Sequence, residues 1–433
     1  MREGTSSRWR AVRVRPAAAA CAALGVLAFG AAGCGSSAPA STAGKTVTLT
    51  FWNAYNETDS EASTMAKIVI PQFEKQNPGI KVTSVVYPYA SLLQKYLAAA
   101  AAGNPPDVLR SDIAWVPQLA SQGVALKVTG LPWFSSISSV ALPGPLQTTE
   151  FHGASYALPL DTNTQALFWN KADFAAAGIS SPPATMSQLF ADAAKLTDKA
   201  KHQYGLGVDG TDIWNVAPYI WSQGGGLTDA AYTSAAGVLD DPATVTAVEQ
   251  LVNLHKAGDI GTDFLGGTGA VSGEEGFPKG QYAMYIDGPW AVSTYAALKP
   301  VPDYGISQFP TGSAGSFSTV GGEDLVISAG GHHLTAAQKF AQFLDSPFAQ
   351  LAMAKAGQMS ALSTTATAEV KATPYYSVFT QQLTTAKVRP VTEDYGKLDA
   401  DFTAALQQIL AGKASVQSGL ASAASQYDSQ TGS

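Results

Sequence analysis

The chain has 433 residues, of which 46% are hydrophobic and 14% charged, so it can bury a sizeable core and is not disordered throughout. Its 33 acidic residues outnumber its 26 basic residues and give a formal net charge of −7. Nucleic acid is not expected as a partner, because a lattice of phosphates requires a basic face. The length predicts two or three domains.

The first 33 residues differ in character from the rest. They hold five Arg and one Glu, and their second half, residues 17–33, is an apolar run rich in Ala and Gly. A basic start followed by such a run is typical of a secretory signal, and the run is too short for a convincing membrane span. We therefore predict a signal peptide over residues 1–33 and exclude it from the fold.

The chain has two cysteines, Cys21 and Cys34, so the sequence after residue 34 allows neither an internal disulfide nor a cysteine nucleophile. The segment Ala31-Ala32-Gly33-Cys34 resembles the lipobox of bacterial lipoproteins, although Ala31 stands where that motif usually has Leu. The resemblance implies that Cys34 carries a diacylglyceryl group and that residues 34–45 form a flexible tether to the membrane. The alternative is a simple signal peptide with a fortuitous cysteine.

Short apolar strands alternate with longer helical periods along the remainder, which predicts an α/β fold. The first part reads as strand, helix, strand, helix, strand, helix, a pattern that favours a largely parallel sheet. The strands are expected at residues 46–52, 80–87 and 107–109, and the helices at 61–76, 89–102 and 113–122.

An extended segment at residues 156–160 ends this part of the chain, and a second set of elements follows. Strands are expected at residues 165–169, 281–286 and 325–328. Helices are expected at residues 186–197, 244–257 and 335–344, and residues 363–425 read as helical almost throughout.

Five segments, taken in order, resemble the extracellular solute-binding protein family 1 of ABC importers, the maltose-binding-protein-like group. They are Phe51-Trp52-Asn53; Asn104 to Leu109 with Asp112; His152 to Pro159 continuing to Leu167–Lys171; Lys279-Gly280 to Gly288-Pro289-Trp290; and Gly321-Gly322 to Ile327-Ser328. The resemblance implies a two-lobe periplasmic-binding-protein-like fold with three hinge crossings and a ligand cleft between the lobes. We expect the crossings near residues 158–160, 303–306 and 359–363. Lobe 1 would then comprise residues 46–158 and 305–360, and lobe 2 residues 160–303 and 364–433.

The resemblance also implies a function. The chain would be an extracytoplasmic, lipid-anchored monomer that captures a mono- or oligosaccharide and delivers it to the permease subunits of an ABC importer, without a cofactor or catalysis. One alternative is a binding protein for another small solute, such as a polyamine, a phosphodiester or a peptide. The other is a secreted carbohydrate-active enzyme with Asp161 and Glu323 as its acid and base.

A carbohydrate is bound by flat aromatic faces against its C–H patches and by planar amide or carboxylate groups against its hydroxyls. The family resemblance implies that Trp290 stacks on a sugar, and that Trp214 and Asp212 are the aromatic and acidic contacts of lobe 2. It also places Asn163 where the family has an acidic sugar contact. Asp161, in the same run, is an equal candidate.

Other candidates follow from position in the predicted sheet. Trp52, Asn53 and Asn56 come at the end of the first strand and Asp112 after the third, where ligands gather in open α/β sheets. Asp112 can alternatively cap the helix that follows it. Glu323 comes after two glycines that let a ligand approach the backbone, although it can equally be a solvated loop acid.

The remaining candidate aromatics include Tyr395, together with Tyr55, Tyr87, Tyr89 and Trp221. Adjacent pairs at Tyr375-Tyr376, His332-His333 and Glu274-Glu275 do not predict a metal or catalytic site. The glycine pattern at residues 205–210 does not predict a dinucleotide site either, because a charged and polar run precedes it instead of a buried strand.

Overall fold

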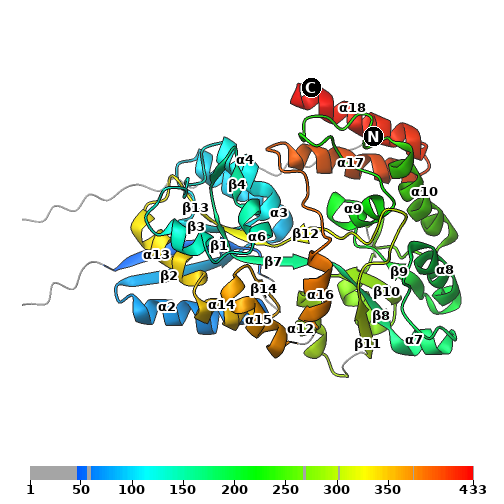
Figure 1. Ribbon diagram of the computed structural model, residues 1–433, viewed down its shortest axis with the longest axis horizontal. Coiled ribbons are helices and arrows are strands. Elements are labelled where there is room, and N and C mark those ends of the chain that lie inside the picture. The colour runs from blue at the N-terminus through cyan, green and yellow to red at the C-terminus, as the bar shows by residue number, and fades with distance from the viewer. Residues whose placement is uncertain (1–45, 56–59, 267–269, 301–302, 374, 433) are drawn as a thin grey trace, which may run out of the picture. The chain divides into compact units, whose positions relative to one another are not determined.

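The computed structural model describes residues 46–55, 60–266, 270–300, 303–373 and 375–432 (Figure 1). The predicted signal peptide, Cys34 and the tether lie outside the described residues, and so does Asn56. Across the described part of the chain, none of the helices combines the length and the apolar character needed to cross a membrane.

The first sheet has the strand order β2-β1-β3-β13-β6. β1 runs parallel to both β2 and β3, whereas β13 is antiparallel to β3 and β6. The predicted parallel opening is therefore confirmed for the first three strands. The strands are β1 (Val47–Asn53), β2 (Ile80–Val86), β3 (Val108–Asp112), β6 (Leu158–Pro159) and β13 (Glu323–Ile327).

Apolar residues of these strands pack against helices to form the first core. Phe340 makes ring contacts with both Phe51 of β1 and Phe73, at centroid distances of 5.4 and 5.0 Å. The helical elements of this part are α1 (Ser60–Thr64), η1 (Met65–Val69), α2 (Ile70–Gln76), α3 (Tyr89–Ala101), η2 (Ile113–Trp115), α4 (Val116–Ser121), α5 (Phe134–Ser138), α6 (Pro143–Thr148), α13 (Leu334–Leu344) and α14 (Pro347–Ala354). A hairpin of β4 (Glu150–Phe151) and β5 (Ala154–Ser155) precedes β6.

The second sheet has the order β11-β8-β10-β9, in which β8 is antiparallel to its neighbours and β9 is parallel to β10. Its strands are β8 (Ala166–Asn170), β9 (Tyr204–Gly207), β10 (Tyr282–Asp287) and β11 (Tyr304–Ser307). Its helical elements are α7 (Lys171–Ala176), α8 (Met186–Leu196), η3 (Lys199–Lys201), α9 (Ile213–Ser222), α10 (Pro242–Ala257), α11 (Gly273–Gly276), η4 (Phe277–Lys279), α12 (Trp290–Ala296), α16 (Tyr376–Leu383), α17 (Tyr395–Leu410) and α18 (Val416–Thr431). The remaining helix, α15 (Ser363–Ala372), packs on α14.

The glycine pattern at residues 205–210 has a packing role at its start. Gly205 lies in β9, where a Cβ atom would collide with the backbone of Ala193 in α8. The missing side chain thus allows close helix-to-strand packing.

Three short strands connect the two sheets and pair with one another in the order β12-β7-β14 (Figure 1). β7 (Asp161–Thr164) lies between β6 and β8 in the chain, β12 (Val320–Gly321) between β11 and β13, and β14 (Met359–Ser360) between α14 and α15. Both pairings of β7 are antiparallel. The connection between the two lobes is thus a small hydrogen-bonded sheet made of the three crossings.

The predicted position of the second crossing, residues 303–306, is wrong. Residues 304–307 form β11, which pairs with β8 in the second sheet, and the crossing strand is β12 at residues 320–321. Tyr304 packs on Phe168 of β8 at a centroid distance of 5.7 Å, so apolar contact holds this strand on the second sheet. Lobe 1 therefore does not resume at residue 305.

Candidate functional site

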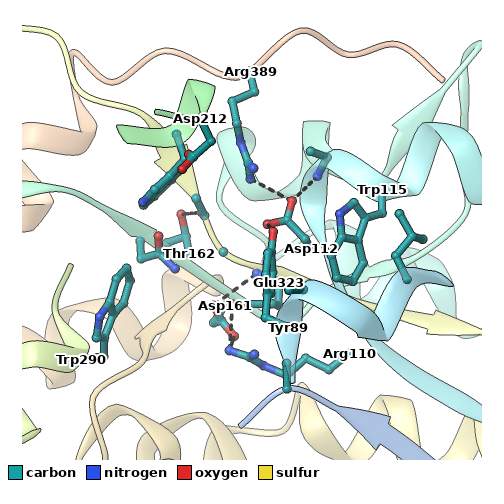
Figure 2. A pocket seen from close by; sticks show the side chains of 18 of the residues that line it. Tyr89, Arg110, Asp112, Trp115, Asp161, Thr162, Asp212, Trp290, Glu323 and Arg389 are labelled. Atoms are coloured by element: carbon teal, nitrogen blue, oxygen red, sulfur yellow. Dashed lines mark hydrogen bonds and ion pairs between the residues drawn. The ribbon is translucent and has the colours of Figure 1, made fainter. Parts of the chain in front are cut away.

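A cavity of about 770 Å³ lies where the two sheets and the crossing strands meet (Figure 2). The first sheet contributes Arg110 and Asp112 from β3 and Glu323 from β13, and β7 contributes Asp161 and Asn163. Helices of the second lobe contribute the residues Asp212, Trp214 and Trp290. The volume is within the range of sites that enclose small molecules.

On one side of the cavity, Asp112 accepts three hydrogen bonds. Arg389 Nη2 donates to Asp112 Oδ1 at 2.8 Å, the Ala114 amide donates to the same oxygen at 2.7 Å, and the Tyr89 hydroxyl donates to Oδ2 at 2.7 Å. The predicted capping role of Asp112 is thus present together with its place in the cavity. Asp112 and Arg389 are both buried, and each neutralises the charge of the other.

Arg389 is held between two aromatic rings of the second lobe. Its guanidinium carbon lies 5.4 Å from the ring centroid of Trp214 and 5.4 Å from that of Tyr395. A guanidinium packed on aromatic faces is fixed in orientation and stabilised by the π electrons. Since Asp112 belongs to the first sheet, Arg389 joins the two lobes across the cavity.

A second arginine, Arg110, lies among three carboxyl groups, of which Figure 2 labels Asp161 and Glu323. Its Nη2 atom is 2.8 Å from Glu323, 3.7 Å from Asp161 and 3.9 Å from Glu61, and its guanidinium carbon is 4.4 Å from the centre of the Tyr55 ring. Burial, and then the neighbouring Glu323, raise the pKa of Asp161 well above its usual range. Asp161 therefore binds a proton more readily than an ordinary aspartate does.

Two further carboxyl groups meet at the N-terminus of α9. Asp212 caps this helix by accepting from the Asn215 amide at 3.2 Å, and Asp399 of α17 accepts from the Ile213 amide at 2.8 Å. Burial, and then repulsion from Asp212, raise the pKa of Asp399 to about 6. The helix N-terminus favours nearby negative charge and so offsets part of this repulsion.

Trp290 begins α12, directly after Gly288 and Pro289, and its half-buried side chain lines the cavity. A Cβ atom on Gly288 would collide with the indole ring, so glycine is required for this ring position. At Gly321 of β12, a Cβ atom would likewise collide with the ring of Trp214 and with Asn163 Oδ1. Gly288 and Gly321 thus leave space for the indole rings of Trp290 and Trp214, which line the cavity.

The structure brings together most of the side chains that the sequence singles out. The residues of this set that line the cavity are Asp112, Asp161, Asn163, Asp212, Trp214, Trp290, Glu323 and Tyr395.

Trp52 and Asn53, in contrast, lie outside the lining. Trp52 packs edge-on against Tyr87 at 4.7 Å, and the fully buried Asn53 donates a hydrogen bond to Ser84 Oγ at 2.8 Å. Their expected role at the ligand is therefore corrected to a structural one, because Trp52 packs on Tyr87 and Asn53 is bonded to β2.

Several lining residues escaped the sequence analysis, above all Arg110, Arg389, Glu61 and Asp399. One signal was present for Arg110, since a charged residue directly after the apolar Val108-Leu109 of a buried strand requires a buried partner. Arg389 carries no comparable signal, because its partners come from distant parts of the chain.

Two of the adjacent pairs that the sequence does not single out lie elsewhere, whereas Glu274 of the third pair lines the cavity. Tyr376 is buried and donates to the Ala354 carbonyl at 2.8 Å, whereas Tyr375 is exposed. His333 lies 3.2 Å from Asp107. Over the residues with a described position, no group of three or more His, Cys, Asp or Glu side chains is placed to hold a metal ion.

Comparison with known proteins identifies the class. The profile of the family described as bacterial extracellular solute-binding protein matches residues 56–351. This is more than half of the chain, and the protein belongs to that family, which consists of extracytoplasmic binding proteins.

Three relatives are among the most similar. A protein of Brucella abortus (strain 2308), described only as a binding protein, is 28% identical over 370 residues, which are 82% of this chain and 87% of the relative. The multiple sugar-binding protein of Streptococcus mutans is 24% identical over 312 residues, covering 69% of this chain and 71% of that protein. The GacH receptor of Streptomyces glaucescens, solved unliganded and with acarbose, has a TM-score of 0.79 and 27% identity, and the match covers 89% of this chain and 97% of the receptor.

Proposed function

We propose that this protein captures a carbohydrate in the cavity between its lobes and delivers it to the permease of an ABC importer. The observation that carries the proposal is the lining itself. Trp214, Trp290 and Tyr395 offer apolar rings, while carboxylates and Asn163 offer the planar acceptors that paired hydroxyls require.

The relatives support the same ligand class. The Streptococcus mutans protein is named for binding multiple sugars, and the Streptomyces glaucescens receptor was solved with acarbose. A structural relative from Thermotoga lettingae, described as an ABC transporter solute-binding protein, was solved with α-D-tagatose, at a TM-score of 0.81 and 23% identity. Its description supports the permease as partner of this chain.

We also propose that Cys34 carries the lipid that holds the protein at the outer face of the cell membrane, and that the protein acts as a monomer. Two acyl chains on one cysteine hold a protein stably, because each buried methylene contributes about 0.8 kcal/mol. The support is the sequence around Cys34, where a basic and then apolar leader is followed by small polar residues.

A hydrolytic role is not proposed. Asp161 and Glu323 both approach the same nitrogen atom, Arg110 Nη2, at 3.7 and 2.8 Å, so they lie together on one wall of the cavity. The acid and base of a glycosidase must instead flank the bond that is cleaved. This arrangement supports binding rather than cleavage as the proposed role of the cavity.

A thermal-shift screen over mono- and oligosaccharides tests the proposal, followed by calorimetry on each hit. Ligand at about one hundred times Kd should raise the stability by about 2.7 kcal/mol. A matched variant, Trp214→Ala, should lose most of the shift, because it removes an aromatic wall of the cavity. The proposal is wrong if no sugar gives a shift while a phosphodiester or peptide does.

A further inference from the structure

The charges that line the cavity do not balance. Counted over the described residues, the lining contains two arginines, no lysine and no histidine, against seven carboxyl groups. The seven are Glu61, Asp112, Asp161, Asp212, Glu274, Glu323 and Asp399. A neutral sugar needs hydrogen-bonding groups but no net charge, so the acidic excess calls for an additional explanation.

The excess is concentrated around Arg110. Asp112 forms a close ion pair with Arg389 at 2.8 Å, whereas Arg110 is shared by Glu323, Asp161 and Glu61. Only Glu323 is at close range, because Asp161 is 3.7 Å from the guanidinium nitrogen. Asp161 is thus a buried carboxyl group, 4% exposed, without a close cation.

Two side chains on one face of β7 also have acceptor atoms without a donor. Asp161 and Asn163 are two residues apart in the strand, so their side chains point to the same side, and both line the cavity. Among the described groups, none donates a hydrogen bond to Asp161 Oδ2 or to Asn163 Oδ1. A buried acceptor without a donor costs free energy, which a ligand that donates would recover.

We propose that the ligand is an amino sugar whose protonated amine binds against Asp161 and Asn163. This proposal rests on the proposed carbohydrate function and specifies its ligand class. An ammonium group has three N–H donors and one positive charge, so it can donate to the two acceptors and stabilise the ionised form of Asp161. A hydroxyl group at the same place would donate one hydrogen bond and leave the charge unchanged.

The titration of Asp161 gives the proposal a second readout. The groups that face it are Glu323, Arg110, Glu61 and Tyr55, and burial together with Glu323 raises its pKa well above the usual range. An ammonium group beside this carboxyl group would lower its pKa again, because a positive charge stabilises the ionised form. Binding of an amino sugar should therefore release protons to the buffer, whereas binding of its neutral counterpart should not.

Calorimetry with matched sugar pairs tests this inference. The pairs are glucosamine and glucose, galactosamine and galactose, mannosamine and mannose, and the β-1,4 trimers of glucosamine and of glucose. At pH 7, at least one amine should bind about tenfold or more tightly than its neutral partner, which corresponds to about 1.4 kcal/mol. Repeating that titration in two buffers of different ionisation enthalpy measures the proton release.

Asp161→Asn is the diagnostic variant. It keeps the shape of the side chain and the Oδ1 atom that accepts from the Glu323 amide at 3.3 Å, and it removes the ionisable carboxyl group. It should abolish both the preference for the amine and the proton release, so that the amine and its neutral partner bind this variant equally within about threefold. Glu249→Gln, an exposed acid on α10 outside the lining, is the matched control and should preserve the preference and the proton release.

The possible outcomes separate the two proposals. Neutral sugars that bind as tightly as their amines would overturn the amine inference and leave the carbohydrate function standing. Binding of spermidine but of no sugar would refute the carbohydrate function and with it the amino sugar. An Asp161→Asn variant that keeps the full preference and the proton release would show that the amine binds elsewhere, and would overturn this placement.

Discussion

Replacing Arg389 by Met should favour separation of the two lobes. In the structure its guanidinium is 5% exposed and forms a 2.8 Å ion pair with Asp112, which belongs to the first sheet. Without Arg389, Asp112 would be a buried and unpaired carboxylate, which costs about 3–5 kcal/mol. The protein can reduce this cost by opening the cavity to water, so the closed state would lose most of that stabilisation while each lobe keeps its core.

We expect the ligand to bind between closed lobes, so this shift should appear as weaker binding. We expect Arg389→Met to lower sugar affinity at least about tenfold, with little change in the ligand-free melting temperature. Small-angle X-ray scattering without ligand should show a larger radius of gyration than the wild type. The double variant Asp112→Asn/Arg389→Met removes both charges and should recover part of the affinity, as a double-mutant cycle would quantify. An unchanged radius together with an unchanged affinity would refute the role of this ion pair in closure.

Three further predictions concern other parts of the chain. Trp290→Ala should lower sugar affinity at least about tenfold in calorimetry with a near-normal melting temperature, whereas a core tryptophan would instead lower the stability by about 3–5 kcal/mol. Cys34→Ala should move the protein from the membrane to the soluble fraction, and persistent membrane binding would show that the predicted leader acts as an anchor. Asp263→Asn should raise the free energy of unfolding at pH 8 by about 1.4 kcal/mol or more and by less at pH 5, measured by denaturant titration. Burial raises the pKa of Asp263 to about 8, and repulsion from Asp209 adds to this effect. The native state therefore binds the proton more tightly than the unfolded chain, and the wild type loses stability as pH rises from about 4 to 8. Equal gains for Asp263→Asn at the two pH values would contradict this reasoning.

The elements that the sequence predicted well are those whose burial follows a regular period. The alternation at residues 46–52 and 80–87 gave β1 and β2, and the helical spacing at residues 244–257 gave most of α10. The helix α9 was missed because it is buried nearly all round and contains Pro218, so it has no polar face to reveal its period. The crossing strand β7 has the sequence DTNT, which reads as a loop, and only its pairing with β12 and β14 makes it a buried strand.

In the candidate site, too, residues with a local sequence pattern could be predicted, and residues that depend on distant contacts could not. Trp290 and Trp214 were found because local glycine motifs and a family resemblance point to them. The ends of strands were a weaker guide, since Asp112 faces the cavity while Asn53 points into the core and bonds to Ser84. The arginines could not be placed, because their role depends on carboxyl groups from several distant segments.

The pairing of the three crossing strands has a mechanical consequence. Connections that ran separately would each bend on their own and let the lobes tilt, twist or slide in several directions. Because β12 and β14 are each hydrogen-bonded to β7, rotation of one crossing strand should move the other two with it. The two lobes should therefore rotate relative to each other about a single shared hinge axis. A solute that fits poorly would stop this swing at the wrong angle, and a membrane partner could reject it by the angle alone, without touching the solute.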